Sequence, residues 1–226
     1  MRWNKLLLVV ILILFPCLGY ILLQSGKNHF VTLPYLGPSE VVESIIDGEV
    51  ISDTLYHKIP DFSFINQLGD TVTQDDFKGK IYVADFFFVS CPTICKEMVK
   101  NMGKIQKEFS SRQQVKLISH TVNPEADSVS VLKEYGEKHD ANPNQWSLVT
   151  GKKKDIYQIA RQGYMVNALV GDGGPTDFIH TELFALIDYD GHIRSFHDGT
   201  TKDGVDNIMD EIKLLMLEKL RKEENR

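Results

Sequence analysis

The sequence predicts an α/β fold in which helices flank a mixed central sheet. Residues 81–89, IYVADFFFV, form a continuous apolar and aromatic run, which is typical of a central strand buried on both faces. The segment after Cys91 carries apolar residues at helical spacing. Near the C-terminus, two strand-like runs flank Asp190-Gly191, a dipeptide typical of a short β-hairpin.

The composition allows one full-sized domain and argues against one class of partner. The chain has 226 residues, of which 42% are hydrophobic, enough for a single core with length left for an anchor and tails. The formal net charge of -6 argues against a nucleic-acid partner, because a phosphate backbone requires a basic face. Three cysteines are too few for a disulfide scaffold.

The N-terminus predicts a membrane anchor. Arg2 and Lys5 precede the uncharged run 6–23, which as a helix would span about 27 Å, close to the hydrocarbon thickness of a bilayer. Because flanking positive charges stay in the cytoplasm, the rest of the chain is expected on the extracytoplasmic, or periplasmic, side. We therefore expect residues 1–25 to be a single-pass anchor in the cytoplasmic membrane.

Two other interpretations of the N-terminus are weaker. A cleaved signal peptide needs small residues at its cleavage site, and the apolar run ends in Leu-Leu-Gln-Ser-Gly instead. A lipoprotein signal at Cys17 is disfavoured because Phe15 and Pro16 replace the small residues expected before a lipidated cysteine. Cys17 is then an apolar membrane residue, which leaves Cys91 and Cys95 as the pair in the globular part.

Beyond the anchor, residues 26–58 predict a linker with one short strand around Glu49–Ile51, followed by a domain over 59–220 and a charged tail over 221–226. The domain is expected to begin with a short strand near Phe62 and the central strand, followed by a helix with Met98, Met102, Ile105 and Phe109 on one stripe. A strand at 115–122, a helix carrying Leu132, a short strand or edge at 145–150 and a helix ending near Gly163 are expected next. The hairpin and a final helix, with Val205, Ile208, Met209, Ile212 and Leu215 on one face, are expected to complete the domain. This is the thioredoxin order of elements.

The chemistry is expected at Cys91-Pro92-Thr93-Ile94-Cys95, where the central strand gives way to a helix. Thiols four residues apart on a helix have Cβ atoms about 5–6 Å apart, so both sulfurs can reach one metal ion. The helix N-terminus also favours thiolate over thiol. A disulfide would require the first turn to tighten or unwind, which Pro92 permits. The pattern leaves metal binding, redox chemistry and a purely structural pair open.

A third ligand would distinguish between metals. Two thiolates and one imidazole suit Cu(I), whereas Zn(II) normally takes a fourth ligand. His180 is the best candidate because it lies in the loop that enters the hairpin. His120, near the end of a predicted central strand, is a weaker one. Solvated or locally hydrogen-bonded roles are expected for four further histidines, namely His57, His139, His192 and His197.

At these residues the chain resembles the Sco/SenC family of copper chaperones for cytochrome c oxidase assembly. The resemblance covers roughly 60–215 and is carried by the Cys91–Cys95 turn after an aromatic strand, by Asp177-Phe178-Ile179-His180-Thr181, and by the segments 120–151, 186–191 and 198–200. It implies Cu(I) ligation by Cys91, Cys95 and His180, with Cu(II) left open. It also implies delivery of the copper to the copper-site subunit of the oxidase or to another copper-receiving protein.

Departures from the family pattern bear on the partner rather than on the ligands. Thr93 and Lys96 stand where the family often has an acidic residue and a second proline, and the run 123–127 replaces a more usual Asp-Pro-x-x-Asp.

Asp85 precedes Cys91 by six residues and resembles the buried acid of thioredoxins. There, a carboxylate whose pKa is raised by burial can accept a proton from a thiol. The competing interpretation is an aspartate at a strand edge with a satisfied hydrogen bond.

Two other functions remain open, and we do not expect a classical enzyme. In a thiol-disulfide reductase that acts on the copper-site cysteines of the target, Cys91 would attack and Cys95 would resolve. In a peroxidase, residues 89–93 would form the peroxidatic loop, since they resemble that of peroxiredoxins. The nearby Cys95 and the absence of an upstream threonine weaken the second reading.

Overall fold

The computed structural model describes residues 14–15, 32–46, 49–92, 94–166 and 181–224. The chain divides into two compact units, Met1–Thr32 and Leu33–Arg226, and only the second is described further. Within the described residues, no helix has the length and apolar character needed to cross a membrane. All but two residues of the anchor expected at 1–25 lie outside the described part.

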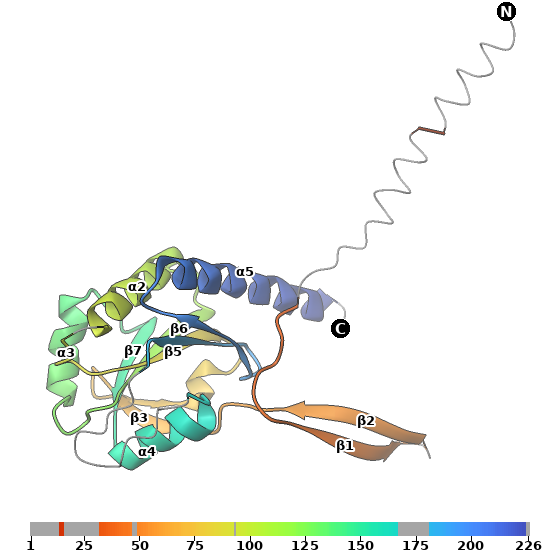
Figure 1. The fold of residues 1–226 in the computed structure, drawn as a ribbon, viewed down its shortest axis with the longest axis horizontal. Coiled ribbons are helices and arrows are strands. Elements are labelled where there is room, and N and C mark those ends of the chain that lie inside the picture. The colour runs from red at the N-terminus through yellow and green to blue at the C-terminus, as the bar shows by residue number, and fades with distance from the viewer. Residues whose placement is uncertain (1–13, 16–31, 47–48, 93, 167–180, 225–226) are drawn as a thin grey trace, which may run out of the picture. The chain divides into compact units, whose positions relative to one another are not determined.

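A mixed seven-stranded sheet forms the centre of the second unit, with strand order β4-β3-β7-β6-β5-β8-β9 (Figure 1). Its strands are β3 (Ser63–Asn66), β4 (Thr71–Thr73), β5 (Ile81–Phe87), β6 (Val115–Thr121), β7 (Trp146–Thr150), β8 (Leu183–Ile187) and β9 (Ile193–Asp198). The three central strands β5, β6 and β7 are parallel, and the outer strands join them antiparallel. The mixed sheet predicted from the sequence is therefore confirmed.

Helices cover both faces of the sheet. They are α2 (Cys95–Glu108), α3 (Val129–Lys138), α4 (Lys153–Gln158), which continues as a π-helical turn over Ile159–Gly163, and α5 (Lys202–Glu224); a 3-10 turn spans Gln74–Phe77. One core contains the buried faces of α2 and α5, and a second core contains that of α4. Figure 1 shows α2 and α5 together on one side of the sheet and α4 on the other.

Strand β5 is buried along its whole length because it has a strand on each side and helices on each face. Successive side chains enter different cores, as alternation along a strand requires: Val83 and Phe87 face α2, whereas Ala84 and Phe86 face α4. The predicted helical stripe is also present, since all four of its residues are buried: Met98, Met102, Ile105 and Phe109. Burial of this stripe fixes the orientation of α2, and with it the position of Cys95.

The structure differs from the sequence prediction in three places. The expected linker contains a long antiparallel hairpin, β1 (Ser39–Ile46) and β2 (Glu49–Tyr56), rather than one short strand. Residues 145–150 contain the expected short strand, β7, but it lies inside the sheet between β3 and β6 and not at the edge that was the alternative. Helix α5 runs to Glu224 and so includes most of the charged tail, because Lys and Arg in a last turn are favoured by the helix dipole.

Candidate functional site

The cysteine turn connects the carboxyl end of β5 to the start of α2. The Cys91 amide donates a hydrogen bond to the Phe88 carbonyl at 3.2 Å, which tightens the chain directly after the strand. Cys95 is the first residue of α2. Both cysteines are thiols rather than a disulfide, and both are only 5% exposed. The sequence therefore placed the pair correctly, at a strand-to-helix junction.

The two thiols interact, and burial controls the acidity of Cys95. Burial raises the pKa of Cys95 to about 12, and a hydrogen bond with the Cys91 side chain adds to this effect. A backbone hydrogen bond from Phe88 acts in the opposite direction. The sequence predicted that the helix N-terminus would favour the thiolate, but at Cys95 the loss of water outweighs that effect. A metal ion that binds here must displace this proton.

Asp85 lies in the middle of β5 and faces the cysteine side of the sheet. With Cys95, Ser119, Tyr135 and Trp146 it lines an enclosed cavity of about 10 Å³, close to the size of one water molecule. Asp85 is 2% exposed, and its Oδ1 atom has no hydrogen-bond partner within the described structure. Burial raises the pKa of Asp85 to about 7. Asp85 does not lie at a strand edge, because β5 is central, but its side chain does have a hydrogen bond with Ser119, which acts to lower the pKa.

Asp127 supports the cysteine turn, a role that the sequence analysis did not identify. Its Oδ2 atom accepts a hydrogen bond from the Val89 amide at 3.2 Å and another from the Thr121 hydroxyl. The carboxylate is buried, so these contacts join the end of β6 to the loop before Cys91. A signal was available in the sequence, since Asp127 follows the strand adjacent to β5, and side chains after adjacent parallel strands meet at one edge.

His180 lies outside the described residues, so the structure does not position the expected third ligand. The neighbouring described chain is held close to α2. The Gly199 amide donates to the Glu182 carbonyl at 2.7 Å, and the Asn101 side-chain amide donates to the Gly199 carbonyl at 2.7 Å. Across the part of the chain that the structure describes, no group of three or more His, Cys, Asp or Glu side chains is arranged to hold a metal ion.

The other described histidines make contacts of their own, and one of them, His139, packs on Tyr135, which lines the cavity beside Cys95. His120 is buried in the second core, where its ring stacks on Phe86 and contacts Phe62, Phe64 and Tyr164. The remaining four make local contacts, in agreement with the sequence analysis: His57 with the Gly163 carbonyl, His139 with the Tyr135 ring, His192 with the His57 carbonyl and His197 with Glu211.

A comparison with known protein families shows which family this fold and cysteine turn belong to. The sequence profile of SCO1/SenC matches residues 52–217, which covers the cysteine turn and the whole seven-stranded sheet. The chain belongs to the SCO1/SenC family. The resemblance inferred from the cysteine and histidine motifs is thus confirmed.

Solved SCO1/SenC structures agree with this membership. A SCO1/SenC family lipoprotein from Bacillus anthracis is 31% identical, with a TM-score of 0.64, over 71% of this chain and 95% of that one. BsSco, described as a Sco family cytochrome c oxidase assembly protein with a disulfide switch, is 29% identical, with a TM-score of 0.60, over 70% and 93%. Yeast Sco1 with copper bound is 25% identical, with a TM-score of 0.55, over 70% and 89%.

The donor set of this SCO1/SenC protein fits a soft metal ion. Two thiol sulfurs from one turn are the ligands that Cu(I) prefers, and hard cations bind oxygen instead. The thiols are shielded from water in the first core, where Phe87 and Val99 lie beside Cys95. An apolar surrounding of this kind limits access of water to a bound ion.

Proposed function

We propose that this protein binds Cu(I) through Cys91, Cys95 and His180 and delivers it to the copper-site subunit of cytochrome c oxidase. The observation that carries the proposal is the pair of interacting, buried thiols in the turn from β5 to α2, the helix that begins at Cys95. Membership of the family supports copper as the metal, because yeast Sco1 has copper bound. It also supports a role in oxidase assembly, because BsSco is described as belonging to a family of oxidase assembly proteins. Copper is the cargo here, so the ligands must also release it.

The described surroundings support His180 as the third ligand. Strand β8 runs antiparallel to β5, with Ala185 opposite Ala84, so the chain approaches β8 from the cysteine end of β5. The link from Glu182 through Gly199 to Asn101 keeps that approach beside α2. An imidazole added to two thiolates completes a three-coordinate Cu(I) site. Exchange of these ligands one at a time for cysteines of the target would release the ion.

A Cu(I) titration of the full chain tests this proposal. Against a chromophoric Cu(I) chelator under reducing conditions, the parent protein should bind one equivalent. Changes beside a metal ligand commonly lower affinity 10–100-fold, so removal of a ligand in Cys91→Ser or Cys95→Ser should lower it by more than about 100-fold. His192→Ala, which changes a histidine in the β8–β9 turn at the other end of β5, is the matched control and should bind as the parent does. Cysteine variants that compete as well as the parent would end the proposal.

A second function is supported by the interaction between the two thiols and by Asp85, which lines one cavity with Cys95. In a thiol-disulfide reductase, the Cys91 thiolate attacks one sulfur of a target disulfide, and the other target cysteine leaves as a thiolate. Cys95 then loses its proton toward Asp85 and attacks the Cys91 sulfur. The target leaves as a dithiol, and this chain holds the Cys91–Cys95 disulfide. Such a step would prepare copper-site cysteines for metal, so the two functions are compatible.

We place the site on the extracytoplasmic side of the membrane, with residues 1–25 as the anchor. The apolar run after Arg2 and Lys5 supports this placement.

A further inference from the structure

The hairpin β1–β2 leaves apolar side chains uncovered on both faces. Val41 is 68% exposed and Val42, the next residue on the same strand, is 42% exposed. Successive residues on a strand point to opposite faces, so neither face rests on the domain. On β2, Leu55 is 55% and Tyr56 41% exposed. An isolated two-stranded hairpin is only marginally stable in water, so this one needs support at its base or a partner.

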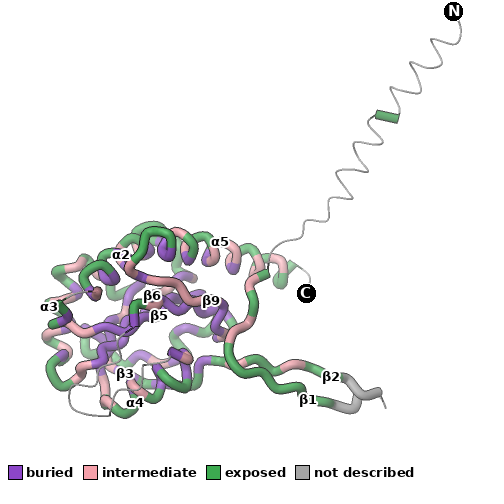
Figure 2. Tube along the Cα trace, in the orientation of Figure 1, coloured by how far each residue is buried: buried purple, intermediate pink, exposed green. Residues whose placement is uncertain are grey.

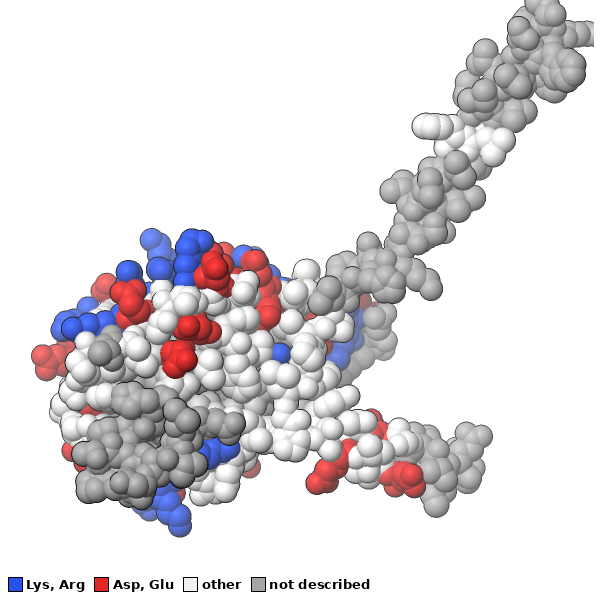
Figure 3. All heavy atoms as spheres, viewed as in Figure 1, with Lys and Arg blue, Asp and Glu red and all other residues white. Residues whose placement is uncertain are grey.

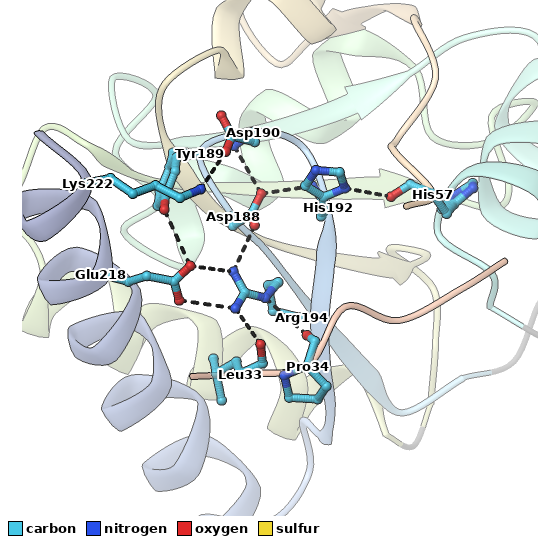
Figure 4. Close-up of polar contacts among 10 residues, drawn as sticks. All are labelled: Leu33, Pro34, His57, Asp188, Tyr189, Asp190, His192, Arg194, Glu218 and Lys222. Atoms are coloured by element: carbon cyan, nitrogen blue, oxygen red, sulfur yellow. Dashed lines mark hydrogen bonds and ion pairs between the residues drawn. The ribbon is translucent and has the colours of Figure 1, made fainter. Parts of the chain in front are cut away.

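The base of the hairpin is firmly attached to the domain. Tyr56 stacks on Tyr35 with ring centroids 4.3 Å apart, and the Arg194 guanidinium lies 4.3 Å from the Tyr35 centroid. The Ile59 amide donates to the Gly191 carbonyl at 2.9 Å. Arg194 also donates to the Leu33 and Pro34 carbonyls, as Figure 4 shows. The attachment therefore presents the two uncovered faces in a defined position.

The hairpin carries acidic residues and no basic ones. Between Asn28 and His57 the sequence contains no Lys or Arg, and its acidic residues are Glu40, Glu43, Asp47, Glu49 and Asp53. Figure 3 shows acidic side chains along the described part of the hairpin, with no basic side chain among them on the visible face. Like charges disfavour a second hairpin or an anionic membrane as the occupant. A protein surface with Lys or Arg beside an apolar strip complements both the acidic charge and the exposed apolar side chains of the hairpin.

The hairpin and the cysteine turn lie at opposite ends of the sheet. Cys91 follows the carboxyl end of β5, whereas the hairpin is attached to the β8–β9 turn, where Ile187 pairs with Tyr82 near the other end of β5. Figure 2 shows the hairpin as an exposed arm beside the buried sheet. A partner on the hairpin therefore leaves the cysteine turn accessible.

We propose that the hairpin β1–β2 is a docking arm for the copper-receiving oxidase subunit, and that it binds a basic, apolar strip of that subunit. This inference rests on the proposed function for the identity of the partner. Docking at a distance from the cysteine turn keeps the copper site near its recipient and raises its effective concentration there. Binding through the arm is then independent of the copper ligands.

The test measures binding of the full chain to the purified copper-site subunit of the oxidase at low and moderate salt. The combination Val41→Ser with Leu55→Ser, and separately Glu43→Lys with Asp53→Lys, should each weaken binding at least tenfold. The charge-reversed protein should also lose most of the salt dependence. Asp61→Lys with Asp70→Lys changes the charge equally at exposed positions of the domain and should stay within twofold of the parent.

Further measurements separate this inference from the proposed function. Cys91→Ser with Cys95→Ser should dock as the parent does, and the hairpin variants should still bind Cu(I). A parent chain that fails to bind Cu(I) would refute the chaperone function without touching the docking result. The docking arm is refuted if the parent does not bind the subunit, or if the hairpin variants bind it equally well. A hairpin-dependent dimer in sedimentation, or hairpin-dependent binding to phosphatidylglycerol vesicles, would also refute it.

Discussion

Asp85 and Cys95 share one cavity, and each prefers its protonated form because both are buried. Transfer of a proton from Cys95 to an ionised Asp85 forms the attacking thiolate and neutralises the carboxylate, so the apolar space never holds two negative charges at once. The 10 Å³ between them admits about one water molecule as a bridge. This arrangement assigns Asp85 to the resolving step and not to the first attack by Cys91.

Asp85→Asn should therefore slow resolution. With Cys91 loaded as a mixed disulfide with glutathione, closure of the Cys91–Cys95 disulfide should fall about 100-fold at pH 7, in the range of other general-base losses. The parent rate should rise through a pH near 7, where Asp85 ionises, and that inflection should be missing from the variant. Asp61→Asn, at an exposed position, is the control. An unchanged closure rate would remove Asp85 from the mechanism.

His120 should make the fold acid-sensitive. Burial lowers the pKa of His120 to about 3, from an ordinary value of 6.5, so the folded state resists a proton that the unfolded state accepts. The associated stability is complete above pH 6.5 and is lost as the pH falls from 6.5 toward 3, by up to about 1.4 kcal/mol per pH unit.

His120→Phe matches the surrounding aromatic rings and removes this titration. Urea unfolding at pH 7 and pH 5 should show a smaller drop in the free energy of unfolding for the variant than for the parent. Asp85 titrates in the same range with the opposite sign, since its raised pKa makes the folded state more stable toward lower pH. The difference between variant and parent isolates His120. Equal drops would show that this histidine does not control the acid response.

Helix α5 is attached to β9 by a buried ionic network. Arg194, 1% exposed, donates to the Asp188 carboxylate at 2.9 Å and to both oxygens of Glu218, at 3.2 and 3.1 Å (Figure 4). The same guanidinium binds the Leu33 and Pro34 carbonyls. One side chain thus connects the entry of the chain, the hairpin base and the last helix.

Arg194→Leu should destabilise the domain by about 3–5 kcal/mol, because it leaves the buried Asp188 without its cation. Urea unfolding at pH 7 measures this. Lys202→Ala removes an exposed cation that pairs with Asp206 and should change stability by less than about 1 kcal/mol. If the two variants were equally stable, the network would not hold α5 in place.

The elements that the sequence predicted well are those with a one-sided or continuous apolar pattern. The stripe from Met98 to Phe109 and the run 81–89 both entered the core as expected. The hairpin was missed because Val41, Val42 and Leu55 lie on two uncovered faces, so no alternation between buried and exposed residues marks the strands. Arg194 was missed because its partners, Asp188 and Glu218, come from different elements, and sequence spacing carries no sign of such a contact.

The copper site and the docking hairpin lie at opposite ends of the sheet. The cysteine turn lies at the carboxyl ends of the parallel strands, where the sequence predicted it. The chain enters at the other end, beside the hairpin, where Leu33 is held by Arg194. This separation allows one end to bind a partner while the other exchanges copper.

The candidate site was only partly predictable from physical rules. Helix geometry and the position of the central strand were enough to identify Cys91 and Cys95 as the candidate pair. The position of Asp85 on that strand, six residues before Cys91, was enough to single it out. His180 lies 85 residues beyond Cys95 in the sequence, and no periodicity connects the two, so only the family resemblance identifies it. Its role as a ligand is the part of the account that most needs a direct measurement.

That measurement is X-ray absorption at the copper edge on the Cu(I)-loaded full chain, for the parent protein and for His180→Ala. We expect two sulfur ligands and one nitrogen ligand in the parent. In His180→Ala the two sulfurs should remain and the histidine nitrogen should be absent. A His180→Ala spectrum that keeps the histidine nitrogen, or a parent spectrum that lacks it, would contradict the three-ligand copper site.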